Sequence, residues 1–208
     1  MKIKICGITQ NSDVDIINEF TPEYAGFIFA KSRRQLTMEQ AQVLCQKVDK
    51  RISKVGIFVN APMEEILLAV RACDLQVVQL HGDEPQASID TIKAQQDVAV
   101  WKAFRIQSSS DLELLQQYTA DAFVLDTFVQ GEYGGSGQTF DWEIARMAAS
   151  KHKLFLAGGL TPLNVKQAIE IAHPYGVDVS SGVACGDKKD REKVEQFIRT
   201  VKEMHAHA

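Results

Sequence analysis

A cysteine and an aspartate in this sequence are placed to act together in proton transfer. Cys6 ends the apolar run IKIC, and Asp126 ends the apolar run AFVLD. If both runs are strands of one barrel, the two side chains approach its mouth from opposite sides and leave room for a small substrate. One group could then remove a proton from carbon while the other donates one to oxygen. A buried apolar thiol at Cys6 and a helix cap or loop hydrogen bond at Asp126 are the alternatives.

Two segments in the last quarter of the chain predict a phosphate site. AGGL (157–160) contains Gly159, and VSSGV (179–183) contains Ser181 and Gly182. Backbone N–H groups of such small residues can close on an anion, and barrels often build phosphate sites from the loops after the seventh and eighth strands. The alternative is that these glycines only permit tight turns.

Other charged or polar segments follow predicted strands. The run KSRR (31–34) could be a solvated cluster, or one of its guanidinium groups could bind a carboxylate in a bidentate manner. His81, in QLHGDE, could titrate or could simply bond to loop backbone. The segment 130–140 is rich in glycine, which suits either a mobile cover over a site or a disordered tip.

The elements that must position these residues are short β-branched or apolar runs. They predict strands at 3–6, 24–29, 54–59, 76–80, 98–104, 122–126, 153–157 and 176–180.

Segments with helical spacing separate the strands, with start signals such as Thr37 and Asp111. Because 208 residues divided by eight gives 26 per unit, each unit is just long enough for a strand, a crossover helix and two tight loops. We therefore expect an α/β fold, a (β/α)8 TIM barrel forming one domain over residues 1–208. A doubly wound sheet is the alternative, but its glycine-rich fingerprint is missing from the first turn, CGIT.

Composition narrows the class of protein. With 23 Lys and Arg, 27 Asp and Glu, a net charge of −4 and 45% hydrophobic residues, the chain should be ordered, and a nucleic-acid partner is disfavoured. No apolar run approaches the roughly 20 residues of a membrane span, and no signal peptide precedes the first strand, so we expect a cytoplasmic protein.

The cysteines predict no metal site. They are far apart, without a C-x-x-C pair or a nearby histidine at ligand spacing. Outside Cys6, we expect Cys45, Cys73 and Cys185 to be small buried hydrophobic residues.

Taken together, the motifs resemble those of the phosphoribosylanthranilate isomerase family of tryptophan biosynthesis. The resemblance covers essentially the whole chain in order, through KICGIT, GFIFAKSRR, VGIFVN, VQLHGDE, VLDT, GGSGQTFDW, LAGGLTPLNV and GVDVSSGV. It implies an Amadori rearrangement, an aldose–ketose isomerisation of N-(5-phosphoribosyl)anthranilate to 1-(2-carboxyphenylamino)-1-deoxyribulose 5-phosphate. It also implies that neither a metal nor a cofactor is used and that the partner is a small phosphosugar substrate. The sequence leaves open whether the protein is a monomer or a homodimer.

The resemblance also assigns roles to residues. Asp126 would be the general acid that opens the ribose ring, and Cys6 the general base that takes the C2′ proton. Arg34, or its neighbour Arg33, would bind the anthranilate carboxylate. Asp178 would lie near the anthranilate amino group, and the substrate-binding residues would further include His81, Gly159, Ser181 and Gly182.

Two other functions compete with this interpretation. The related sugar isomerase of histidine biosynthesis performs the same rearrangement on a substrate with two phosphates, but it has an aspartate where Cys6 stands. A non-catalytic phosphosugar-binding barrel would retain AGGL and SSGV without needing both Cys6 and Asp126.

Overall fold

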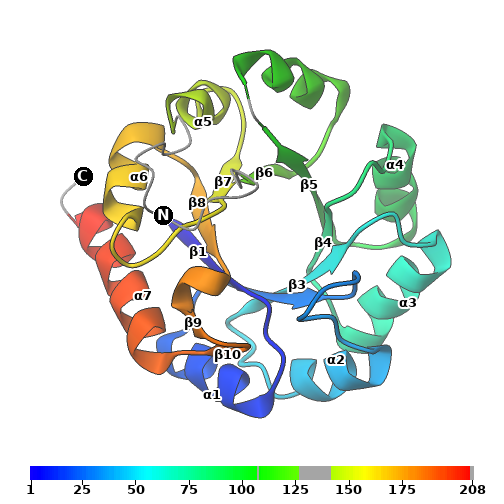
Figure 1. Cartoon of the computed structure of the whole chain (residues 1–208). Coiled ribbons are helices and arrows are strands. Elements are labelled where there is room, and N and C mark those ends of the chain that lie inside the picture. Colours follow the sequence, from blue (N-terminus) through cyan, green and yellow to red (C-terminus); the bar gives the residue numbers. More distant parts are fainter. Residues whose placement is uncertain (107, 127–141, 207–208) are drawn as a thin grey trace.

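Eight parallel strands close into a barrel surrounded by helices (Figure 1). This is a computed structural model, and it describes residues 1–106, 108–126 and 142–206, with side chains up to residue 204. Each strand pairs with its neighbours in chain order, and β1 closes the barrel against β8. The predicted (β/α)8 fold is confirmed, whereas the single domain over residues 1–208 stays a prediction.

All eight predicted strands are present with small shifts at their ends. The barrel strands are β1 Lys2–Cys6, β2 Tyr24–Ile28, β3 Ser53–Phe58, β4 Val77–Leu80, β5 Ala99–Arg105, β6 Ala122–Asp126, β7 Leu154–Ala157 and β8 Gly176–Val179.

The strands are connected by helices. The α-helices are α1 Asn11–Phe20, α2 Met38–Cys45, α3 Met63–Cys73, α4 Gln86–Gln95, α5 Trp142–Ala149, α6 Val165–Ala172 and α7 Arg191–Ala206, and the 3-10 helices are η1 Ser109–Gln117 and η2 Ser181–Val183.

Of the two predicted helix-start residues, Thr37 caps its helix and Asp111 does not. Thr37 caps α2 through a capping box, in which its hydroxyl accepts from the Gln40 amide at 3.2 Å and Gln40 Oε1 accepts from the Thr37 amide at 2.9 Å. Asp111 does not precede its helix. It is the third residue of η1, where its carboxylate accepts from the Ser108 amide at 2.9 Å, and the segment is 3-10.

A small feature after β8 was not predicted. The two-residue strands β9 (Ala184–Cys185) and β10 (Lys188–Lys189) form an antiparallel pair before α7. Cys185 is exposed there, so its predicted burial is wrong, while Cys45 and Cys73 are buried as expected. Of the four residues in this short pair only Lys189 is buried, and Cys185 belongs to its exposed part.

Aromatic side chains fill the barrel interior near the amino ends of the strands. Trp101 stacks on Phe155 with ring centroids 4.3 Å apart, and Tyr24 meets Trp101 edge-on at 4.9 Å. These aromatic rings fill the interior near the amino ends of β2 and β7, as is usual for barrels of this size. Open space for a ligand is therefore left at the carboxyl ends of the strands.

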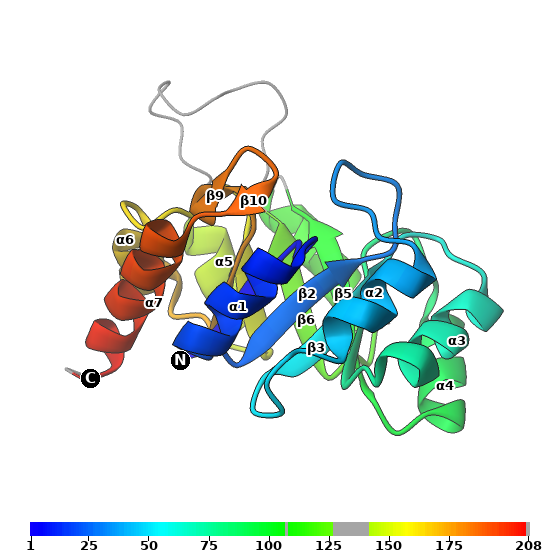
Figure 2. The ribbon, with the colours of Figure 1, turned by 90° about the horizontal axis from the view of Figure 1, so that it is seen from below.

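Figure 2 shows the molecule from the side. The β9–β10 pair and the segment between β2 and α2 lie at the same end of the barrel, the end at which the parallel strands finish. Of the helices in the described part of the chain, none combines the length and apolar character that crossing a membrane requires.

Candidate active site

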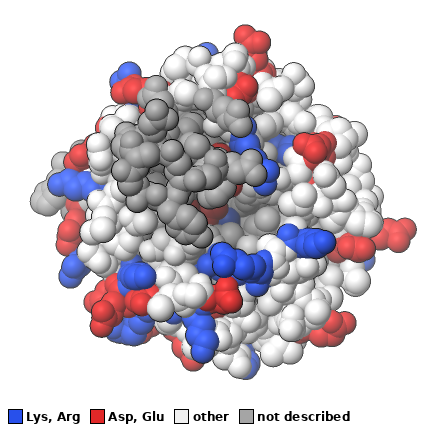
Figure 3. Space-filling view, viewed as in Figure 1, with Lys and Arg blue, Asp and Glu red and all other residues white. Residues whose placement is uncertain are grey.

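A cavity of about 260 Å³ lies at the carboxyl ends of the strands. Six of the eight predicted site residues line it, namely Cys6, His81, Asp126, Gly159, Asp178 and Ser181. Arg34 and Gly182 lie beside this lining, in contact with its residues. Figure 3 looks toward this end and shows Lys and Arg side chains on the rim, over the segment between β2 and α2.

Cys6 is held in a space made by a glycine. It is the register partner of Gly26 on β2, and a Cβ atom at Gly26 would lie 2.8 Å from Cys6 Sγ. The Cys6 carbonyl accepts from Lys189 Nζ at 2.6 Å and from Ser180 Oγ at 3.1 Å. The last residue of β1 is thus fixed by its neighbours on both sides, and its thiol lines the cavity.

The charges around Cys6 act in opposite directions on its thiol. Burial raises the pKa of Cys6, and the negative charge of Asp178 raises it as well. Two ammonium groups, those of Lys4 and Lys189, lower the pKa of the same thiol. Whether Cys6 becomes a thiolate therefore depends on these lysines.

Lys189 reaches the site from β10. Its ammonium donates to the Cys6 and Ser180 carbonyl oxygens at 2.6 and 3.0 Å, and its backbone amide donates to Asp13 at 2.9 Å. Burial lowers the pKa of Lys189 to about 8, even though the Cys6 and Asp13 charges act to raise it. The side chain joins the ends of β1 and β8 beneath the mouth.

Asp126 faces a histidine across the mouth. His81 Nε2 lies 3.6 Å from Asp126 Oδ2, and both side chains are mostly buried. On the other side of the ring, His81 Nδ1 is 2.9 Å from Gln79 Nε2. Gln79 therefore fixes the orientation of the imidazole, and Asp126 keeps enough exposure, 25%, to reach a ligand.

Arg34 rather than Arg33 points toward the site. Arg34 Nη1 donates to Ser180 Oγ at 3.3 Å, and its Cδ packs where a Cβ on Gly7 would stand. Its Nε is buried and has no hydrogen-bond partner among the described residues, whereas the Arg33 side chain is exposed. Arg34 thus has an unused donor beside the cavity.

A corner of the cavity is built from small residues. Gly159 has a φ of +61° with open space where a Cβ would stand, so its backbone is accessible from the cavity. A Cβ at Gly182 would lie 1.8 Å from the Leu160 carbonyl oxygen, so the two loops meet there only because residue 182 is glycine. The close approach brings the segments around Gly159 and Ser181 together, as a phosphate site would require.

Asp178 has one oxygen engaged and one available. Its Oδ2 accepts from Lys4 Nζ at 2.6 Å, and its Oδ1 is buried with no hydrogen-bond partner in the part of the chain that the structure describes. Since Asp178 lines the cavity, Oδ1 can accept from an N–H group of a ligand.

Three site residues escaped the sequence prediction: Lys4, Gln79 and Lys189. Lys4 and Gln79 each stand two residues before a predicted site residue, so the alternation of a strand could have placed them on the inward face. Nothing in the local sequence marks Lys189, because two-residue strands have no periodic pattern.

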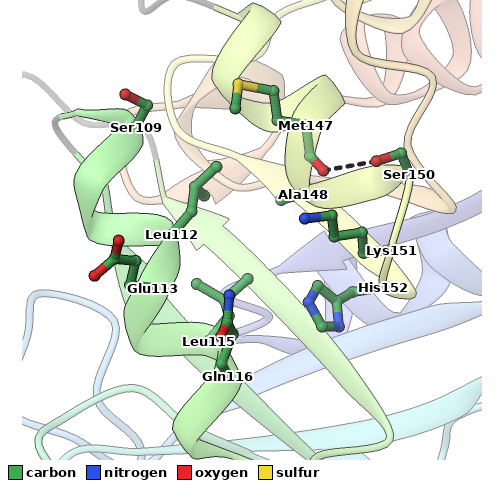
Figure 4. Close-up of a pocket in the computed structure, with 10 residues that line it drawn as sticks. All are labelled: Ser109, Leu112, Glu113, Leu115, Gln116, Met147, Ala148, Ser150, Lys151 and His152. Carbon is green, nitrogen blue, oxygen red and sulfur yellow. Dashed lines mark hydrogen bonds between the residues drawn. The ribbon is translucent and has the colours of Figure 1, made fainter.

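The segment 130–140, predicted to be a cover or a disordered tip, lies outside the described residues. A second cavity of about 480 Å³ lies between η1 and α5, on the outside of the barrel (Figure 4). Its lining contains Leu112, Met147 and His152 and none of the predicted site residues.

Comparisons with known proteins agree with this arrangement. A family model described as N-(5'phosphoribosyl)anthranilate (PRA) isomerase matches residues 3–200. The N-(5'-phosphoribosyl)anthranilate isomerase of Thermoanaerobacter sp. is 45% identical over 202 residues, covering 97% of this chain and 98% of that protein. The protein of the same name from Clostridium acetobutylicum is 40% identical over 206 residues, covering 98% and 99%.

Solved structures give the same result. Phosphoribosyl anthranilate isomerase from Thermotoga maritima superposes with a TM-score of 0.87 at 36% identity, covering 98% of this chain and 99% of that chain. A phosphoribosyl anthranilate isomerase in complex with reduced 1-(o-carboxyphenylamino)-1-deoxyribulose 5-phosphate has a TM-score of 0.84 at 33% identity, with the same coverage.

Proposed function

This chain belongs to the N-(5'-phosphoribosyl)anthranilate isomerase family, and from that premise we propose that it converts N-(5-phosphoribosyl)anthranilate to 1-(2-carboxyphenylamino)-1-deoxyribulose 5-phosphate in tryptophan biosynthesis. The observation that carries the assignment of roles is that Cys6 and Asp126, from β1 and β6, line one cavity. Those strands are not neighbours in the barrel, so a substrate can lie between the two groups.

Asp126 is the general acid in this proposal. In its protonated form it donates to the ribose ring oxygen, the C1′–O bond breaks, and the nitrogen lone pair forms an iminium at C1′. His81, at 3.6 Å from the carboxylate, orients Asp126 and contacts the substrate on the same side. The ring opening leaves Asp126 as a carboxylate.

Cys6 is the general base. Its thiolate removes the proton from C2′, which is acidic because the neighbouring iminium accepts the electrons of the C–H bond. The product of this step is an enolamine. Protonation at C1′ and loss of the O2′ proton then give the ketone, so after the ring has opened the reaction needs only proton transfers.

The remaining site residues hold the substrate. The guanidinium of Arg34 binds the anthranilate carboxylate at the rim, and the free Oδ1 of Asp178 accepts from the anthranilate N–H. The phosphate is bound by the backbone around Gly159, Ser181 and Gly182. The two ends of the substrate are thus held by different strands, which orients C2′ toward Cys6.

A fluorescence assay tests the proposed reaction. Freshly prepared phosphoribosylanthranilate should lose its anthranilate-type fluorescence much faster with the purified protein than in buffer alone. Protein that binds phosphosugars tightly but leaves the fluorescence decay at the buffer rate would instead be the non-catalytic binding barrel.

The proposal also includes the partner, the location, the assembly state and the domain organisation of the protein. A small phosphosugar is its partner, the protein works in the cytoplasm as a monomer or homodimer, and residues 1–208 form one domain. Size-exclusion chromatography with light scattering distinguishes the two assembly states.

A further inference from the structure

A lysine is buried within the barrel immediately below Cys6. Lys4 has 0% of its surface exposed, and it lies on β1 two residues before Cys6. Alternation along the strand places both side chains inside the barrel, while Ile3 and Ile5 between them pack outward in the helix-facing core. Lys4 is also the register partner of Tyr24, part of the aromatic packing at the lower half of the interior. The ammonium therefore lies between that packing and the thiol.

The ammonium of Lys4 is only partly neutralised. Asp178 is its register partner on β8, and Lys4 Nζ donates to Asp178 Oδ2 at 2.6 Å. The Lys4 charge also interacts with Cys6, and the pKa of Lys4 is raised by both negative partners against the opposing effect of burial. Lys4 thus remains a cation at neutral pH.

Stability alone gives a poor explanation for this lysine. Moving an ion pair out of water costs about as much as its attraction returns, and apolar side chains of similar volume often replace such pairs without loss. A methionine or leucine would fill the space below Cys6. The charge therefore calls for a functional explanation.

Resting on the function proposed above, we propose that Lys4 is a positioning residue that stabilises the thiolate form of Cys6, and that Asp178 sets how much of the Lys4 charge reaches the sulfur. The carboxylate of Asp178 offsets part of that charge at rest. Its free Oδ1 is the group assigned to the substrate N–H, so ligand binding and the state of the base share one carboxylate.

Other charged or titratable side chains of the described residues also face Cys6. They are Lys189 from β10, Arg34 from the segment after β2, and, across the cavity, Asp126 on β6 and His81 after β4. Lys189 acts in the same direction as Lys4, but it also bonds to the Cys6 and Ser180 carbonyl groups. Its replacement would disturb the backbone, so Lys4 gives the cleaner test.

The experiment measures the pH dependence of Cys6 alkylation without substrate. Iodoacetamide is applied from pH 5 to 10 in a Cys185→Ser background, since Cys185 is exposed, and the Cys6 peptide is quantified by mass spectrometry. Lys4→Met should raise the midpoint by at least about one pH unit, since an opposite charge at this range shifts a pKa by about 1–3 units. Asp178→Asn should lower it. Lys2→Met, on the same strand but half exposed, should leave it unchanged.

Opposite shifts in the Lys4 and Asp178 variants are the signature of the proposal, because a structural defect would move both in one direction. A Lys4→Met midpoint within about 0.3 units of the parent overturns it, as does an upward shift in Asp178→Asn. If Lys4→Met does not fold, as judged by circular dichroism, Lys4→Arg should keep the parent midpoint, and the Asp178→Asn shift decides. Alkylation requires no turnover, so an inactive protein with these shifts contradicts the proposed function alone.

Discussion

His81 Nε2 lies 3.6 Å from Asp126 Oδ2, while Gln79 holds the opposite side of the imidazole at 2.9 Å. His81 follows β4 and Asp126 ends β6, so the two residues are far apart in the sequence. The structure places them as one unit on the side of the cavity that faces Cys6 across the barrel. Residues in such contact should not contribute independently to a reaction.

The coupling can be measured with a double-mutant cycle. Asp126→Asn should lower kcat by at least about a hundredfold, the scale of general acid catalysis, because an amide is far too weak an acid to protonate the ring oxygen. His81→Ala should cost about tenfold in the parent enzyme. In the Asp126→Asn background it should cost little more, since the carboxylate on which it acts is gone. Steady-state kinetics on the four proteins supply the cycle, and fully additive losses would contradict a joint role.

Replacement of Cys6 by serine removes the proposed base. A serine hydroxyl is far less acidic than a thiol, so Cys6→Ser should reduce kcat by at least about a hundredfold with little change in the fold. Cys185→Ser is the matched control, because that thiol is exposed on β9 and should leave turnover unchanged. Turnover of Cys6→Ser at the rate of the parent would remove Cys6 from the mechanism.

The sequence predicted Cys6 and Asp126 because chemistry in barrels of this kind sits at strand ends, and the apolar runs IKIC and AFVLD end in those residues. Lys4 was missed for a physical reason. A lysine inside an apolar run is usually exposed, and its burial follows only from the identity of its register partner, Asp178, 174 residues away.

The position of Lys189 in the site could not be predicted from the sequence for a different reason. Its contact with the Cys6 carbonyl joins β10 to β1 across 183 residues, and β10 is too short to be recognised by periodicity. The choice between Arg33 and Arg34 was similarly undecided. Adjacent residues after a strand can face either way, and only the turn between β2 and α2 brings Arg34 against Ser180.

Separate replacements of Arg33 and Arg34 test which of the two binds the anthranilate carboxylate. Arg34→Ala should raise KM with a smaller change in kcat, because a carboxylate far from the reacting carbon is bound in both the ground and transition states. Arg33→Ala is the matched control and should leave both parameters unchanged, since its side chain is exposed. The reverse result, with KM raised only by Arg33→Ala, would transfer the carboxylate contact to Arg33.

Lys189 should make stability depend on pH in the alkaline range. Burial lowers its pKa in the folded protein from 10.5 to about 8, so between these values the unfolded chain binds more protons than the folded one. The free energy of unfolding should therefore rise with pH through this window, by up to about 3 kcal/mol from this group. Lys189→Met lacks the titrating group and should show a flatter rise, whereas Lys188→Met, exposed on the same strand, should follow the parent. Urea unfolding at a series of pH values from 7 to 10.5 measures the difference between the curves, with Cys6→Ser in all three proteins because the charge of Lys189 also shifts the pKa of that thiol. Parallel curves for Lys189→Met and the parent would mean that Lys189 holds its proton in the folded state as firmly as in the unfolded chain.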